Sequence, residues 1–311
     1  MTSAASATFG SAGRGEVTPP QQAAQQLYLN LDGSADDQMG NYNVANEAAV
    51  TYGEDRFGQT GSAAYFDGDA TIIEYADGVN LLSEDFTLST WIYVDTIDHF
   101  DANGALAGMF VFGIGNFQGI HLELHQWAKY NRMKFAQSFE TSSTVAGEEV
   151  TAEDFTVWDL NGTLEGFEVN RGADFENTVD GGLAGLMVGK WAHLVYVYNS
   201  AENKRYCYIN GELQRSDDFT QSTIDKITKI TNMTLNRSDV QDEPADDDYI
   251  SDRLAIGFTH GSDSKRWSTE PWGGYSIPTS QHFKGAIDDF RVFSAALSAT
   301  EVADLYDAEK P

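Results

Sequence analysis

Alternation of apolar and polar residues with a period of two is the feature that most constrains the fold of this chain. Side chains on a strand point to opposite faces in turn, so this period is typical of strands half-buried in a sheet. In the longest run, residues 86–94, one face carries Phe86, Leu88, Thr90 and Ile92. Further strands are predicted at residues 27–31, 63–66, 71–75, 109–114, 120–125, 191–198, 204–209, 254–258 and 283–293. The pattern predicts an all-β fold of antiparallel strands.

Two local signals fix the ends of elements. Asn210-Gly211 stands between two alternating runs, and this pair favours the tight turn of a β-hairpin because both residues tolerate a positive φ. Near the C-terminus, Ser298 and Glu301 have the spacing of a capping box, with Leu297 and Val302 as the accompanying hydrophobic pair. A short helix is therefore expected after Ser298.

Charge and composition exclude some classes of function. The 311 residues include 19 Lys and Arg against 48 Asp and Glu, a net charge of -29, so the surface repels phosphate backbones and no nucleic-acid partner is expected. A strongly acidic surface suits solubility or the binding of divalent cations. No apolar run approaches the roughly 18 residues of a transmembrane helix. The single cysteine, Cys207, allows no disulfide within the chain.

The domain organisation predicted is one sandwich with additions. Residues 1–26 are rich in Ser, Ala, Gly and Gln and have the composition of a flexible linker, without the apolar region of a signal peptide. Residues 27–311 form the single predicted domain. Two polar stretches, near 140–189 and 240–252, are predicted to be insertions into it.

Six short motifs, in order along the chain, resemble those of laminin-G-like domains in the concanavalin A-like lectin and glucanase superfamily. They include FTLSTW at 86–91, WAH at 191–193, YING at 208–211 and GAIDDFRVF at 285–293, besides segments at 29–41 and 55–68. The resemblance implies a two-sheet antiparallel jelly roll. It also implies an exported or cell-surface protein that handles polysaccharides, part of a longer protein from which the signal sequence is missing. That architecture hosts many functions, so the fold alone does not give the activity.

The same resemblance implies a structural calcium ion near the opening acidic turn and the closing strand. The residues that match are Asp32, Asp37, Asn41 and Asp288, with Asp67 and Asp289 behind them. Calcium takes carboxylate and carbonyl oxygens as ligands, and acidic turns supply both. The alternative is that these acids simply cap turns, where Asp and Asn are common.

A second candidate site is the segment His121-Leu122-Glu123-Leu124-His125. Alternation places both histidines and Glu123 on one face and the leucines on the other, and Arg132 and Lys134 would join the polar face from the next strand. Such a face could line a groove for a glycan, bind a transition metal, or supply a general base. It could equally be a solvated sheet surface with cross-strand ion pairs.

Tryptophans divide into two groups by their surroundings. Trp91 and Trp191 lie in apolar strands and are predicted to belong to the core. Trp127, Trp158, Trp267 and Trp272, together with Tyr275, lie in polar, loop-like sequence. Exposed aromatic rings stack on sugar faces, so Trp127, Trp267, Trp272 and Tyr275 are predicted to bind a glycan. A long loop anchored by its own aromatic side chains would have the same composition.

The function predicted from these features is non-catalytic binding of a polysaccharide or oligosaccharide by a secreted or cell-surface module. One alternative is a polysaccharide lyase or glycoside hydrolase that uses the His121, Glu123 and His125 face. The other is a protein–protein adhesion module. The chain contains no Glu-x-Asp sequence of the kind that carries the paired acids of laminarinase-like hydrolases.

Overall fold

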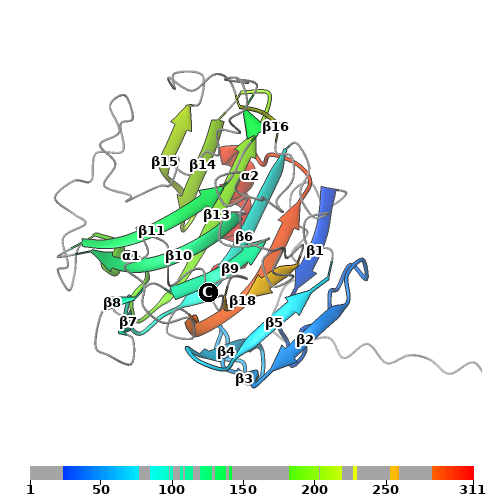
Figure 1. Ribbon diagram of the computed structural model, residues 1–311, viewed down its shortest axis with the longest axis vertical. Helices are drawn as coiled ribbons and strands as arrows, with labels where there is room; N and C mark the ends of the chain where they lie inside the picture. Colours follow the sequence, from blue (N-terminus) through cyan, green and yellow to red (C-terminus); the bar gives the residue numbers. More distant parts are fainter. Residues whose placement is uncertain are drawn as a thin grey trace, which may run out of the picture.

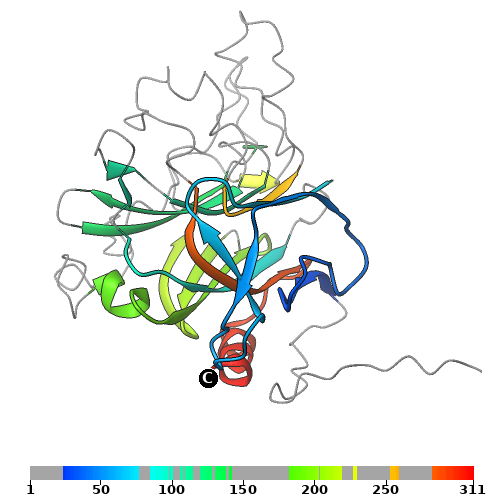
Figure 2. The same ribbon diagram turned by 90° about the horizontal axis from the view of Figure 1, so that it is seen from below.

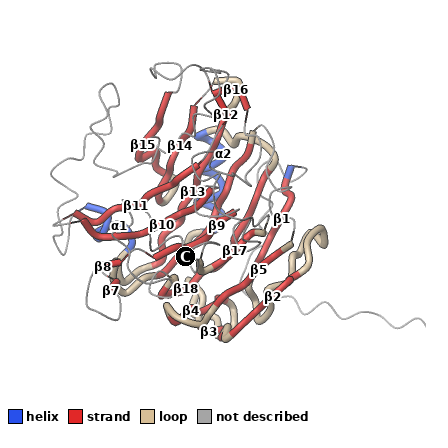
Figure 3. Tube along the Cα trace, in the orientation of Figure 1, coloured by secondary structure: helices blue, strands red, loops and turns tan. Residues whose placement is uncertain are grey.

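The computed structural model describes thirteen stretches of the chain. They are residues 24–76, 85–97, 99–100, 106–107, 109–114, 120–127, 130–137, 140–141, 182–202, 204–218, 227–229, 253–258 and 282–311. Within them, two antiparallel sheets lie face to face, and strands far outnumber helices (Figures 1 and 3). The predicted all-β sandwich with a short C-terminal helix is confirmed.

The eight-stranded sheet is built around one long central strand, β18 (Lys284–Phe293). Its order is β15 (Glu212–Asp218), β14 (Lys204–Ile209), β13 (Trp191–Asn199), β6 (Phe86–Tyr93), β18, β4 (Ala63–Asp67) and β3 (Thr51–Gly53). On the side away from β6, β18 pairs first with β4 and then with β1 (Gln25–Leu29).

The six-stranded sheet faces it. Its order is β11 (Tyr130–Gln137), β10 (Ile120–Trp127), β9 (Met109–Ile114), β17 (Leu254–Ile256), β5 (Ile72–Tyr75) and β2 (Val44–Ala48). Two small pairs complete the strands described: β12 (Glu140–Thr141) with β16 (Ile227–Lys229), and β7 (His99–Phe100) with β8 (Leu106–Ala107). A one-and-a-half-turn helix, α1 (Gly182–Met187), precedes β13.

The main core lies between the two sheets, where the inward side chains of both exclude water. It contains the predicted face of β6, with Phe86, Leu88 and Ile92 buried, and the leucines of β10. β2 and β3 were not predicted, because their short sequences have no clear alternation of apolar and polar residues.

A second, smaller core lies on the outer side of the eight-stranded sheet, beneath α2 (Ala299–Glu309). Figure 2 shows α2 on the side of this sheet that faces away from the six-stranded one. Val195, Val197 and Phe293 of the sheet pack there against Val302 and Leu305 of the helix. The predicted capping box is confirmed: Ser298 Oγ accepts from the Glu301 N–H, and Glu301 accepts from the Ser298 N–H.

The predicted hairpin at Asn210-Gly211 is confirmed and also touches α2. Both residues have a positive φ, 53° at Asn210 and 77° at Gly211. A Cβ atom added to Gly211 would lie 2.9 Å from the ring of Tyr306. This glycine is therefore needed for the turn and for the close approach of the helix. Neither of the helices in the described stretches has the length and apolarity to span a membrane.

We predict that Gly211→Ala destabilises the protein more than Gly61→Ala does. Both glycines have a positive φ, where an alanine costs about 1–2 kcal/mol, but only Gly211 has a side chain against it. The free energy of unfolding from urea titration measures both variants. Equal losses would show that the contact with Tyr306 is easily relieved.

Candidate functional site

The structure buries two residues of the polar face predicted on β10, His121 and Glu123. Cross-strand pairs join Leu124 to Met133 and Leu122 to Phe135, so these side chains share the inner face as predicted. His121 and Glu123 are on the outer face, yet they are only 1% and 0% exposed. A solvated sheet surface is therefore excluded at these two positions.

The same outer face carries a row of paired residues that crosses five strands. His121 pairs with Gly113, Gly113 with Ala255, Ala255 with Glu74, and Glu74 with Asn46. Residues directly opposite in antiparallel strands share a face. In this row Gly113 and Ala255 therefore lie between the imidazole of His121 and the carboxylate of Glu74.

Glu74 was not predicted, and its polar partners hold it in this row. It is 4% exposed and accepts a hydrogen bond from Asn46 Nδ2 at 3.0 Å. Arg253, at the start of β17, lies 3.5 Å from its carboxylate.

Beside His121 lie the two ends of the segment that carries Trp267, Trp272 and Tyr275. Phe258 and His282, which border residues 259–281, have ring centroids 5.5 Å apart and ring planes tilted by 40°. The Phe283 N–H donates to the Gly257 carbonyl oxygen at 2.7 Å, which closes the base of the segment.

Phe110 connects this base to the polar face of β10. It forms a bridge with His282, and its ring meets that of His121 edge-on at 5.2 Å. The β10 histidine and the residues that border the aromatic segment, Phe258 and His282, thus lie close together, although they are far apart in the sequence.

A second polar group lies on the outer side of the other sheet, where a β-bulge interrupts β18. The pairing of β18 with β6 shifts between Asp288 and Arg291, and Asp289 has a φ of 47°. Ile287 and Phe290 point into the main core, so the two aspartates between them both point outward. A regular strand would send consecutive side chains to opposite faces.

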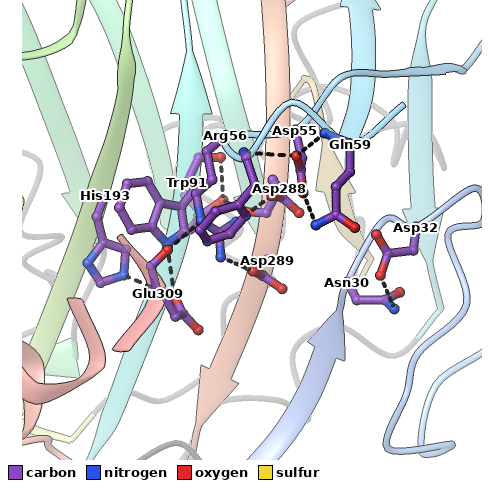
Figure 4. A network of polar contacts seen from close by, with 12 residues as sticks. Asn30, Asp32, Asp55, Arg56, Gln59, Trp91, His193, Asp288, Asp289 and Glu309 are labelled. Atoms are coloured by element: carbon purple, nitrogen blue, oxygen red, sulfur yellow. Dashed lines mark hydrogen bonds and ion pairs between the residues drawn. The ribbon is translucent and has the colours of Figure 1, made fainter. Parts of the chain in front are cut away.

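Arg56 binds both aspartates of the bulge (Figure 4). Its Nη1 contacts Asp288 Oδ2, and its Nη2 lies 2.6 Å from Asp289 Oδ2. Asp55 holds the turn that presents Arg56, because its Oδ1 accepts from the N–H groups of Phe57 and Gln59 at 2.9 and 2.8 Å. The arginine and both aspartates are buried, so the charges compensate one another away from water.

Glu309, at the end of α2, extends this network. Its Oε1 lies 2.9 Å from Arg291 Nη2, its Oε2 accepts from Trp91 Nε1 at 2.8 Å, and its carbonyl oxygen accepts from Arg56 Nε at 2.7 Å. Burial raises the pKa of Glu309, although Arg291 opposes that shift. The C-terminal helix is thus tied to three strands or turns by charge-assisted hydrogen bonds.

His193 lies at the edge of this network and is held neutral. Its Nε2 is 2.8 Å from Ser89 Oγ, and its ring stacks on Trp91 at a centroid distance of 5.0 Å. Burial, and then the positive charges of Arg56 and Arg291, lower the pKa of His193 to about 3. An imidazolium would need partners for both N–H groups, and Nδ1 has no hydrogen bond.

The four predicted calcium ligands do not fit a metal ion as they are placed. Asp37 uses both oxygens on backbone N–H groups: Oδ1 accepts from Tyr28 and Met39, and Oδ2 from Asn41 and Tyr42, at 2.8–3.1 Å. Asp288 faces Arg56, Asn41 donates its amide to a carbonyl oxygen, and Asp32 accepts from Asn30. In the described stretches no three His, Cys, Asp or Glu side chains are grouped to hold a metal. Calcium stays a prediction from the resemblance.

The remaining predicted residues fall into three groups. Trp267, Trp272 and Tyr275 lie outside the described residues. For Trp127, His125 and Arg132 the structure gives the backbone pairing, Trp127 with Tyr130 and His125 with Arg132. Trp91 is buried as predicted, but Trp191 is only half-buried, so its assignment to the core is wrong.

Arg56, Glu74 and Glu309 were missed, because no local sequence signal links them to their partners.

Comparisons with known proteins find similarity in structure and none in sequence. No protein-family model and no curated protein matches the chain. The binding domain of botulinum neurotoxin serotype C1 has 15% identity and a TM-score of 0.51 over 92% of this chain and 52% of that one. Domain 4 of AbnA, an extracellular GH43 arabinanase from Geobacillus stearothermophilus solved with arabinotriose, has 14% identity and a TM-score of 0.46, over 91% and 98%. The chain spans about half of the toxin domain, and that likeness shows the shared sandwich fold.

We predict that Arg56→Met destabilises the protein by about 3–5 kcal/mol, because it removes the guanidinium group from buried Asp288 and leaves buried Asp289 with the more distant Arg291, 3.8 Å away. Arg253→Met is the matched control. Arg253 is 45% exposed and 3.5 Å from Glu74, so its loss should cost less than about 1 kcal/mol. Urea unfolding measures both, and a similar small loss in both would mean that the aspartates find other partners.

The low pKa of His193 predicts a loss of stability in acid. Its folded-state value, about 3, is below the 6.5 of an exposed histidine, so the unfolded chain binds the proton first as the pH falls. The contribution of neutral His193 to the free energy of unfolding is complete above pH 6.5 and decreases towards pH 3. At pH 5 about 2 kcal/mol of it is lost. Urea midpoints at pH 7 and 5 should differ less in His193→Gln than in the natural chain. An unchanged difference would assign the pH dependence to other groups.

Proposed function

We propose that this chain is a non-catalytic carbohydrate-binding module. One observation carries the proposal: the base of the segment with Trp267, Trp272 and Tyr275 is fixed beside His121 on the outer face of the six-stranded sheet. A fixed base favours binding by an aromatic segment, because the segment then loses less conformational entropy when the ligand binds. In this proposal the aromatic rings contact the sugar.

The burial of His121 and Glu123 favours the binding module over a lyase or hydrolase on this face. A general base must come within hydrogen-bonding distance of its substrate, and these side chains are covered. In the binding module His121 contacts Phe110, and Phe110 pairs with His282 at the base of the aromatic segment.

The resemblance to laminin-G-like domains adds to this proposal. Its motifs coincide with the strands that organise the sandwich: FTLSTW lies in β6, WAH opens β13, and GAIDDFRVF forms most of β18. We propose on this basis that the chain is a laminin-G-like module of a secreted or cell-surface protein. The sandwich itself hosts many functions, so the argument for sugar binding depends on the side chains.

The experiment is a glycan array probed with the whole chain, first in calcium chloride and then in EDTA. At least one neutral glycan is expected to bind. Trp267→Ala, Trp272→Ala and Tyr275→Ala should each weaken the binding about tenfold, since a stacked ring contributes on the order of 1 kcal/mol. Trp158→Ala, a tryptophan outside this segment, is the matched control and should bind as the natural chain does.

Each outcome decides one part of the proposal. An array without any hit would overturn sugar binding and favour the adhesion alternative. Unchanged affinity in all three variants would remove the site from this segment. Depolymerised product would support the enzyme instead, and binding that is insensitive to EDTA would contradict the calcium prediction.

A further inference from the structure

Three aromatic side chains form a single row across the eight-stranded sheet. Tyr65 of β4 pairs with Ala286 of β18, Ala286 pairs with Tyr93 of β6, and Tyr93 pairs with Trp191 of β13. Residues that are directly opposite in antiparallel strands share a face, so the three rings lie on the same side.

That side faces away from the sandwich core. Among the sequence neighbours of the row, Ala64, Ile92, Ala192 and Ile287 are buried between the sheets. Tyr65 is 37% exposed, and Tyr93 and Trp191 are half-buried. The row is therefore an accessible surface, although each of its residues lies in a regular strand.

The helix α2 covers the outer face of the eight-stranded sheet only as far as the residues just before this row. Tyr306 stacks on Trp91 at 5.7 Å and on His193 at 6.0 Å. Tyr93 and Trp191 are the next outward-facing positions on the same two strands, two residues beyond Trp91 and His193. The helix thus covers one half of the outer face and leaves the aromatic row open.

The spacing and tilt of the rings suit an extended, twisted ligand. Tyr93 and Trp191 have centroids 5.9 Å apart and ring planes 54° apart. Tyr65 is two strands from Tyr93, a distance of about 10 Å, with only the small Ala286 between them. Rings that turn relative to one another, as neighbouring strands do, match a single glycan chain better than a flat crystalline surface.

Polar groups near the row include the acids Glu54 and Asp95, which can accept hydrogen bonds from sugar hydroxyls, and the exposed Lys190 and Lys284. The Tyr65 hydroxyl donates to the Glu54 carbonyl oxygen at 3.0 Å. Burial and the carboxylate of Asp95 raise the pKa of Tyr93, and burial and Glu54 raise that of Tyr65, so both phenols keep their protons. Together with the chain's charge of -29, these acids disfavour uronic or sialic acids.

We propose that Tyr65, Tyr93 and Trp191 form a second binding site, which takes a single chain of a neutral polysaccharide. The rings stack on successive sugar faces, and Ala286, which is buried, lies between Tyr65 and Tyr93 in the row. This site shares only its class of ligand with the proposed function, because it lies on the other sheet from His282, which borders the segment with Trp267 and Trp272 and pairs with Phe110 of β9.

The test is affinity electrophoresis in native gels that contain mixed-linkage β-glucan, xylan, galactomannan or, as the anionic probe, polygalacturonate. The starting protein is the full chain with Trp267→Ala, Trp272→Ala and Tyr275→Ala, so that the first proposed site has lost its three rings and the aromatic row is intact. At least one neutral polysaccharide should retard it, and polygalacturonate should not. Adding Trp191→Leu or Tyr93→Leu should weaken the retardation about tenfold, which corresponds to about 1.4 kcal/mol.

The leucine variants keep the apolar volume and remove only the flat ring. Tyr65→Ser is the second variant, because Tyr65 is the most exposed ring of the row and its loss should least affect folding. Leu213→Ala, at a position 47% exposed on β15, is the matched control and should be retarded like the starting protein. Melting temperatures establish that each variant is folded.

The results separate this site from the proposed one. Retardation of the natural chain but not of the starting protein would overturn the aromatic row and support the aromatic segment. Retardation of the starting protein that disappears in the row variants would support the row whatever the glycan array shows. No retardation by any polysaccharide would overturn the inference. A change of oligomeric state in the row variants, with unchanged retardation, would assign the row to a second copy of the chain.

Discussion

The contact between the guanidinium group of Arg56 and the paired carboxylates of Asp288 and Asp289 supports the outer side of the eight-stranded sheet. It joins residues 232 and 233 positions apart, and all three side chains are buried. Charges in such a place are stable only when each has its partner, so the turn, the bulge and the end of α2 depend on one another. Removing one member leaves the others without compensation, which makes this part of the fold cooperative rather than modular.

The two outer faces of the sandwich are consequently different in kind. On the eight-stranded sheet, α2 and the Arg56 turn cover one half with a small apolar core and an ionic network, while the other half presents the row of Tyr65, Tyr93 and Trp191. On the six-stranded sheet, Phe110, His121 and His282 hold the base of a segment rich in tryptophan. A sandwich offers two such surfaces, because only the inner faces of its sheets are fully committed to the main core.

Local pattern predicted the elements well, because each signal acts over a few residues. The alternation in β6, the positive φ of Asn210-Gly211 and the Ser298 capping box all appear in the structure as expected. The network could not be predicted, because its members are distant in sequence and no local rule pairs Arg56 with Asp288. For the same reason the acids of β18 resembled metal ligands, when their carboxylates in fact face a guanidinium group. Trp191 was assigned to the core because β13 is apolar on both faces, so alternation gives no sign of which side meets water.

The bulge at Asp288–Asp289 also explains how one strand serves three environments. Before the bulge, Ala286 and Asp288 face outward; after it, Arg291 and Phe293 do, because one extra residue reverses the parity of the strand. Without that reversal, Phe290 and Val292 would leave the main core and Phe293 would leave the patch beneath α2. The positive φ of Asp289 is therefore what allows β18 to place a small residue in the aromatic row, charges at its centre and an apolar side chain under the helix. The backbone strain at this one residue is offset by the two ionic contacts with Arg56 that it makes possible.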